Sequence, residues 1–196
     1  HNNFGNTLAE LGRLELAEAS YKQAIVLKSD FVEAHNNLGN ICRKLGKLEQ
    51  SEASLRQATV LKDDYFEAHS NLGVTLKELG RLEESEASLR QALAVKPDHA
   101  EVHSNLGITL KELGRYDEAE TNLRQAIVLK PDFAEAQNNL GNTLQELGRL
   151  DEAEASYKRA IALQPDYAEA HHSLSFTLVK SGKLKEGLDE YEWRWK

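Results

Sequence analysis

An internal repeat with a period of 34 residues constrains this chain more than any other feature of its sequence. Two columns of glycine and one of asparagine share that spacing. The first glycine column is Gly5, Gly39, Gly73, Gly107 and Gly141, and the second is Gly12, Gly46, Gly80, Gly114, Gly148 and Gly182. The asparagines are Asn3, Asn37, Asn71, Asn105 and Asn139. A fixed period of this length is typical of architectures built by stacking one structural unit on the next.

Each repeat is predicted to contain two helices. In the stretch from Val32 to Leu45 the apolar residues fall at helical spacing, and Gly46 then offers a left-handed stop. A second helix is expected from about Glu49 to about Lys62. No window alternates as a strand would, so the sequence predicts an all-α fold. One helix pair cannot bury its own apolar stripe, whereas stacked pairs can, and the result is a solenoid.

A D-x-x-E motif stands before the first helix of every repeat from the second onward and at two of the second helices. We interpret each Asp as a helix N-cap and each Glu as a carboxylate that favours the positive helix end. The alternative is a set of acid/base pairs, but an active site need occur only once. The pairs are Asp30–Glu33, Asp64–Glu67, Asp98–Glu101, Asp132–Glu135, Asp166–Glu169, Asp117–Glu120 and Asp151–Glu154.

The charge balance argues against two classes of partner. The 196 residues include 24 Lys and Arg against 32 Asp and Glu, which gives a net charge of −8. Binders of nucleic acid or of anionic membranes are usually basic, so we expect neither partner. No apolar stretch is long enough to span a bilayer, and no signal segment opens the chain. The chain begins at His1, so we expect a processed protein or an excised fragment, with a cytoplasmic setting as the default.

The repeat resembles the tetratricopeptide repeat (TPR). The matching residues in one repeat are Leu140, Gly141, Gly148, Ala153, Tyr157, Ala160 and Pro165. The resemblance covers the whole chain and implies a right-handed superhelical solenoid of stacked antiparallel helix pairs. It divides the single array into residues 1–31, 32–65, 66–99, 100–133, 134–167 and 168–196. The family's usual Ala is replaced by Ser51 and Ser85, and its usual Pro by Ser29 and Asp63, without an expected effect on the fold.

The asparagine column is the candidate binding site. In TPR proteins the first helix of each repeat lines the concave face, so the resemblance places these amides in a ladder along a groove. Amide side chains can bond the backbone of an extended peptide whatever its side chains. The alternative is that each Asn tethers the backbone of a neighbouring repeat. The predicted peptide-binding residues are Asn3, Asn37, Asn71, Asn105, Asn139, Asn6, Asn40, Asn142, Asn36, Asn138, Lys77 and Lys111.

A carboxylate clamp like that of chaperone-binding TPR relatives is not favoured. That clamp places Lys and Arg around groove asparagines, whereas this chain has Glu in one of the corresponding columns. Positive charge remains at Lys44, Lys77 and Lys111, but each can pair with a nearby Glu. We therefore do not expect recognition of an acidic C-terminus.

The asparagine ladder also resembles the TPR region of the O-linked N-acetylglucosamine transferases. In those enzymes the array guides protein substrates into a separate glycosyltransferase domain, which is absent here. The segment Tyr191–Trp195 is similar to the tail of arrays that precede bacterial glycosyltransferase domains. The resemblance implies a substrate-recruiting module with a protein or peptide partner in extended conformation.

Neither catalysis nor a metal or other cofactor is expected of this chain. Histidines recur as His1, His35, His69, His103 and His171, but equivalent places in stacked repeats are too far apart to ligate one metal ion. Cys42 falls on an apolar helix face, where a thiol is usually inert. No phosphate loop, nucleophile triad or nucleotide fingerprint appears.

A structural scaffold that self-associates through its open ends is the alternative function. Terminal repeats normally need a polar outer face. At the C-terminal end, Arg194 replaces a usual small residue between Trp193 and Trp195, and Ser175 and Gly187 replace the usual Gly and Ala. We expect the two tryptophans to pack against a further domain or a second copy. The other possibility is that they fold back over their own repeat.

Overall fold

The computed structural model describes the backbone of residues 1–195 and the side chains of residues 1–193. The side chains of Arg194 and Trp195, and Lys196 as a whole, lie outside the described residues. The chain falls into two compact units, an N-terminal unit of His1–Pro97 and a C-terminal unit from Asp98 onward. In the described residues, no helix is both long and apolar enough to cross a membrane.

The described part of the chain is all-helical, as the repeat predicts. The N-terminal unit contains α1 (Asn2–Glu10), α2 (Leu14–Leu27), α3 (Val32–Lys44), α4 (Leu48–Leu61), α5 (Phe66–Glu78) and α6 (Leu82–Val95). The C-terminal unit contains α7 (Ala100–Glu112), α8 (Tyr116–Leu129), α9 (Ala134–Glu146), α10 (Leu150–Leu163), α11 (Ala168–Lys180), α12 (Leu184–Tyr191) and the 3₁₀ turn η1 (Glu192–Trp195).

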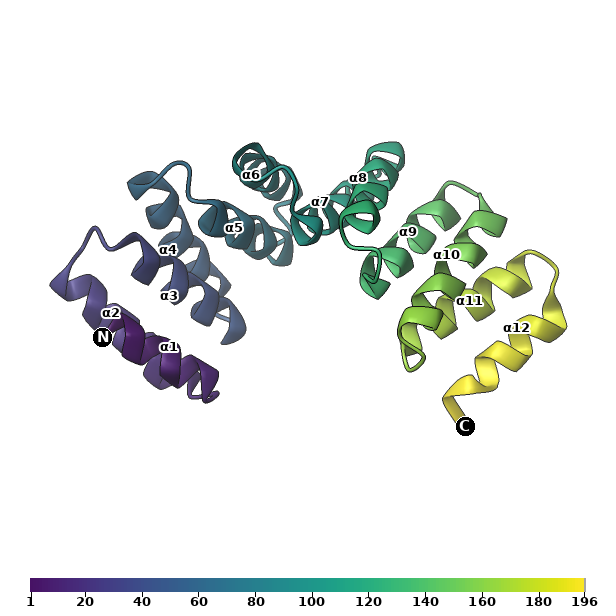
Figure 1. Cartoon of the computed structure of the whole chain (residues 1–196), viewed down its shortest axis with the longest axis horizontal. Coiled ribbons are helices and arrows are strands. Elements are labelled where there is room, and N and C mark those ends of the chain that lie inside the picture. Colours follow the sequence, from purple (N-terminus) through teal and green to yellow (C-terminus); the bar gives the residue numbers. More distant parts are fainter. Residues whose placement is uncertain (196) are drawn as a thin grey trace. The chain divides into compact units, whose positions relative to one another are not determined.

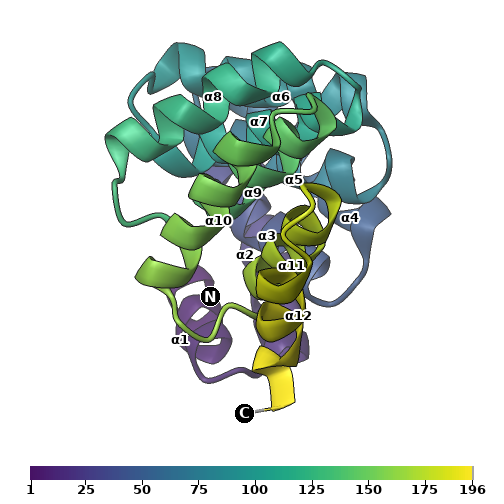
Figure 2. The ribbon, with the colours of Figure 1, turned by 90° about the vertical axis from the view of Figure 1, so that its right-hand side faces the viewer.

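Each repeat is a pair of helices that pack against each other, and each pair packs on the next within its unit (Figure 1). The pairing of α9 with α10 and of α11 with α12 can also be followed in Figure 2. In addition, α1 contacts α3 and α3 contacts α5, while α7 contacts α9 and α9 contacts α11. The first helices of consecutive repeats therefore form one continuous surface in each unit. We call it the first-helix face.

The two glycine columns have different structural causes. Gly46 and its equivalents end the first helices with a positive φ, which is 72° at Gly46, and glycine adopts that conformation without steric cost. Gly39 instead lies where the two helices of one repeat cross. A Cβ there would lie 2.5 Å from Cγ of Leu55, so only hydrogen fits. In the last repeat, Ser175 replaces the crossing glycine of the first helix, and the glycine without room for a Cβ is Gly187 on the second helix. Ser175 Oγ donates to the Gly187 carbonyl at 2.7 Å.

The structure contradicts the Asp half of the D-x-x-E interpretation, whereas the Glu of each motif before a first helix does lie in the first turn, at the positive helix end. The N-cap of α3 is Phe31, one residue after Asp30, and no side chain caps that helix. The same holds for the other first helices that follow a D-x-x-E motif. At α10 the N-cap is Arg149, so Asp151 lies within the first turn. Glu120 and Glu154 instead form ion pairs.

Candidate functional site

In the N-terminal unit the asparagines of the first-helix face bond one another across repeats. Asn37 Nδ2 donates to Oδ1 of Asn2 at 3.2 Å and of Asn6 at 3.1 Å. Asn71 Nδ2 donates to Oδ1 of Asn36 at 3.0 Å. The asparagine column therefore connects neighbouring repeats in this unit. The bonds run between side chains, whereas the tethering alternative had each Asn bond the backbone of a neighbouring repeat.

In the C-terminal unit the same column is not committed to such bonds. Asn105 and Asn139 are half-buried on α7 and α9. Their backbone carbonyls accept from Thr109 and Thr143, each at 2.9 Å. Among the described residues, neither side-chain amide has a hydrogen-bond partner. Two amides on neighbouring helices are thus open to an external partner.

The other predicted asparagines are not all accessible. Asn36 and Asn138 are buried between consecutive first helices, at 7% and 0% exposure, so their side chains stabilise the stack and do not line an open face. Asn138 Nδ2 donates to Glu169 at 3.2 Å. Asn3 and Asn6 are exposed, and Asn40 accepts from Arg43 Nη2 at 3.3 Å.

A polar hollow of about 310 Å³ lies on the first-helix face of the C-terminal unit. Two of the predicted residues, Lys111 on α7 and Asn142 on α9, line it together. The lining also includes Tyr116 at the start of α8, and Gln145 and Glu146 at the end of α9. The hollow thus combines a cation, an anion, a phenol and two carboxamides, which is a set that can bond both the N–H and the C=O of a peptide.

An ion pair bridges the corresponding residues in the N-terminal unit. Arg43 is the equivalent of Lys111, which lies 68 residues, or two repeats, further along the chain. Glu78 is likewise the equivalent of Glu146. Arg43 Nη1 donates to Glu78 Oε1 at 3.0 Å. Neither Lys77 nor Lys111 forms an ion pair with a described residue, so the expected pairing with a nearby Glu is absent. The first-helix hollow is open because Lys111 does not reach across it.

A tyrosine behind the hollow orients its amides. Tyr157 from α10 is fully buried, and its hydroxyl donates to Asn142 Oδ1 at 2.8 Å and lies 3.3 Å from Gln145 Oε1. Thr177 Oγ1 also donates to Gln145 Oε1, at 3.0 Å. Burial raises the pKa of Tyr157, so the phenol stays a donor. With their oxygens occupied, the carboxamide NH₂ groups of Asn142 and Gln145 remain as donors for a ligand.

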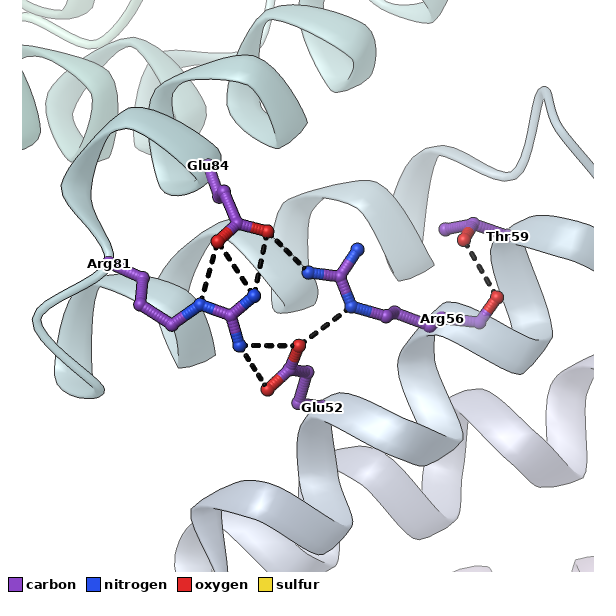
Figure 3. A network of polar contacts seen from close by, with 5 residues as sticks. All are labelled: Glu52, Arg56, Thr59, Arg81 and Glu84. Carbon is purple, nitrogen blue, oxygen red and sulfur yellow. Dashed lines mark hydrogen bonds and ion pairs between the residues drawn. The ribbon is translucent and has the colours of Figure 1, made fainter.

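An ion-pair ladder on the second helices was missed in the sequence, although the same 34-residue period carries it. In four repeats a Glu accepts from a base four residues later and from a second base in the next repeat. Glu52, for example, accepts from Arg56 and Arg81 at 2.7 Å each, and Glu84 closes the network (Figure 3). The other members are Glu18 with Lys22 and Lys47, Glu120 with Arg124 and Arg149, and Glu154 with Lys158 and Lys183.

These hydrogen bonds lower the pKa of the ladder carboxylates. Bonds from Lys22 and Lys47 hold the pKa of Glu18 below its ordinary value, and those from Lys158 and Lys183 do the same for Glu154. For Glu52 desolvation opposes the shift, but Arg56 and Arg81 outweigh it and lower the pKa. The ladder therefore joins repeats to one another.

Three of the recurring histidines bond the turn that precedes their own helix. Nε2 of His35 bonds the Ser29 carbonyl at 2.9 Å, and His69 and His171 bond the Asp63 and Pro165 carbonyls in the same way. Among the described residues, no three His, Cys, Asp or Glu side chains gather as metal ligands would. Cys42 is buried, and burial raises the pKa of its thiol.

The first C-terminal tryptophan folds back on its own repeat. The Trp193 ring stacks on His171, with centroids 3.7 Å apart and planes 9° from parallel, and Glu190 bonds the other side of the imidazole. The stack places Trp193 over its own repeat, which is the other possibility that the sequence left open, while a further contact with a domain or a second copy stays a prediction. The prediction for Trp195 concerns a side chain outside the described residues.

The repeat length, the helix pairs and the glycine crossings define this molecule as a TPR protein. The chain belongs to the family described as the cilia and flagella-associated protein 70 C-terminal domain, whose model matches residues 2–176. No protein with a curated description matches it.

Several solved structures are similar to the chain. YrrB, described as a TPR protein with an unusual peptide-binding site, is 25% identical with a TM-score of 0.74, over 88% of this chain and 89% of YrrB. TTC0263, a thermophilic TPR protein from Thermus thermophilus, is 26% identical with a TM-score of 0.70, over 91% and 97%. PilW, a type IV pilus biogenesis factor, is 23% identical with a TM-score of 0.90, over 96% and 88%, and supports the fold alone.

Proposed function

We propose that this chain is a non-catalytic protein-interaction module that holds an extended polypeptide on the first-helix face of its C-terminal unit. The observation that carries the proposal is the pair of half-buried, unbonded amides of Asn105 and Asn139 on the two helices that also form the hollow at Lys111. YrrB, a TPR protein of similar fold, is described by its peptide-binding site. Binding through peptide groups predicts weak preference for side chains.

The test compares backbone recognition with side-chain recognition. The probes are unstructured 12-residue peptides of acidic, neutral and basic composition, each made also with N-methylated backbone amides. We expect the unmodified peptides to bind with similar affinity and the N-methylated ones to bind more weakly, because a methylated amide cannot donate. Binding that survives N-methylation would contradict the proposal.

Two matched double variants separate binding from stability. Asn105→Ala with Asn139→Ala should weaken binding by about 0.5–1.5 kcal/mol per lost hydrogen bond and leave unfolding unchanged. Asn37→Ala with Asn71→Ala removes bonds between repeats, so it should lower the free energy of unfolding. Equal effects of both pairs on binding would remove the distinction between the two units.

We also propose that the module recruits substrates for a glycosyltransferase. The support is the likeness of the repeats and of the segment Tyr191–Trp195 to arrays that precede such enzymes. The coding sequence that follows Lys196 provides the test. A glycosyltransferase-like βαβ pattern there would support this role, and an unrelated sequence would contradict it.

Self-association as an assembly scaffold is the second candidate function. The observation that favours it is a set of exposed apolar side chains on α11 and α12, with Phe176 at 58%, Leu184 at 58% and Leu188 at 52% exposure. Phe176 and Leu188 line one hollow together, and a large exposed apolar surface usually marks a contact. Sedimentation should show mass increasing with concentration, and Leu188→Glu should abolish the increase. A monomer at every concentration would exclude this function.

A further inference from the structure

A second hollow lies in the C-terminal unit, away from the proposed peptide site. It has a volume of about 410 Å³ and is formed by α8, α9 and α10. Ile127 and Val128 of α8 and the buried Leu140 of α9 give it apolar walls. Its size falls within the range of small-ligand pockets, about 300–1,000 Å³. We call it the α8–α10 pocket.

The pocket exists at the place where the histidine column is interrupted. In three other repeats the histidine imidazole bonds the carbonyl six residues earlier, as His35 does with Ser29 at 2.9 Å. Gln137 replaces that histidine and lines the pocket. Its side chain is only 7% exposed, and within the described chain it has no hydrogen-bond partner. A buried carboxamide is therefore left facing an empty space.

A second buried polar group faces the same space. Ser156 on α10 is 8% exposed and lines the pocket. Two serines at equivalent positions, Ser20 and Ser54, each donate to the carbonyl four residues earlier at 2.9 Å. In the described residues, Ser156 makes no such bond. Two unpartnered polar groups side by side carry a desolvation cost that a ligand amide would relieve.

The rim of the pocket carries a positive charge at a position that is uncharged in the other repeats. Arg159 stands in a column that is glutamine in the four preceding repeats, at Gln23, Gln57, Gln91 and Gln125. It has no ion-pair partner in the described part of a chain whose net charge is −8. Arg124, across the pocket, already bonds Glu120 at 2.8 Å and Glu152 at 3.3 Å. Arg159 is thus the group that would meet an anion.

We propose that the α8–α10 pocket binds an aliphatic group that carries both an amide and a carboxylate. The aliphatic part lies against Ile127, Val128 and Leu140, the amide bonds Gln137 and Ser156, and the carboxylate pairs with Arg159. Two sources share this chemistry: a free N-acylated aliphatic amino acid, and an aliphatic residue followed by an acidic one inside a polypeptide.

The test uses one probe for each source, with changes in NMR chemical shift as the measurement of binding. The free ligand is N-acetyl-leucine, and its control is N-acetyl-leucine amide, which lacks the carboxylate. The polypeptide form is a short peptide, blocked at both ends, that contains Leu-Glu, and its control contains Leu-Gln. We expect saturable shifts at the residues lining the pocket with at least one carboxylate probe, and binding about tenfold weaker or more for its control.

The chain itself supplies the variants. Arg159→Gln and Gln137→His each restore the residue that other repeats carry, so the helices should remain intact by circular dichroism. Arg159→Gln should lower affinity for the carboxylate probe to that of its control, and Gln137→His should fill the pocket and abolish binding. Asn139→Ala, on the first-helix face, should leave this binding unchanged even if it abolishes peptide binding there. Absence of shifts with both probes, or equal binding of the wild type and Arg159→Gln, would overturn the proposal.

Discussion

The hydroxyl of Tyr157 lies 2.8 Å from Oδ1 of Asn142 and donates to it. The equivalent bond, also 2.8 Å, joins Tyr21 to Asn6 in the N-terminal unit. A buried residue of a second helix thus fixes a polar side chain of the first-helix face. In the C-terminal unit this bond determines which end of the Asn142 carboxamide is open to a ligand, so packing and binding depend on the same contact.

Replacement of Tyr157 by Phe should separate these two roles. The ring keeps its packing, but Asn142 and Gln145 lose their buried donor, so the free energy of unfolding should fall by about 0.5–1.5 kcal/mol. Urea unfolding followed by circular dichroism measures it. Tyr116→Phe is the control, because the Tyr116 hydroxyl has no hydrogen-bond partner among the described residues. An equal loss in both variants would show that the bond to Asn142 contributes nothing specific.

A methyl group at Gly141 should destabilise the C-terminal unit. A Cβ there would lie 2.5 Å from Cε1 of the fully buried Tyr157. That ring has no free space to move into, so overpacking should cost about 1–3 kcal/mol, reduced by the better helix propensity of Ala, about 1 kcal/mol. Combining Gly141→Ala with Tyr157→Ala should remove the clash. Strictly additive losses in thermal unfolding would refute a steric origin.

The repeat pattern was sufficient to predict the helix pairs. Period, apolar spacing and the glycine stops act locally, and the positive φ of Gly46 follows from a glycine placed directly after an apolar helical stretch. The hollow at Lys111 could not be predicted in this way, because it depends on whether a long side chain reaches its partner in the next repeat. Arg43 reaches Glu78, whereas Lys111 does not reach Glu146.

The D-x-x-E motif shows a second limit of local reasoning. The spacing of Asp151 and Glu154 is that of a helix cap, but the structure shows that tertiary contacts fix the position of Glu154 instead. Glu154 meets a base on its own helix and another in the following repeat, both at 2.7 Å. The columns of Lys and Arg were visible in the sequence and would have indicated the ladder, had they been compared with the column of Glu.

The two acidic residues of that motif should therefore differ in their effect on stability. Glu154→Gln removes the charge from a side chain that is 11% exposed and paired twice, and should cost about 1 kcal/mol. Asp151→Asn changes a side chain that is 94% exposed and 4.0 Å from Lys183, and should change the free energy of unfolding by less than about 0.5 kcal/mol. A larger loss for Asp151→Asn in urea unfolding would restore the capping interpretation.

The ladder also predicts how stability depends on pH. The pKa values of Glu18 and Glu154 are lowered from an ordinary value of 4.5, chiefly by hydrogen bonds from Lys22 and Lys158. A carboxylate with a lowered pKa in the folded state stabilises that state above its unfolded pKa, and this contribution is lost as the pH falls through the folded pKa. The free energy of unfolding should thus stay constant from neutral pH down to about pH 5 and then fall steadily.

Urea unfolding across that range measures the effect, with Glu154→Gln as the comparison. Its slope below about pH 5 should be shallower than that of the wild type, since one of the linked protons is gone; identical slopes would show that the ladder carboxylates do not set the acid limit.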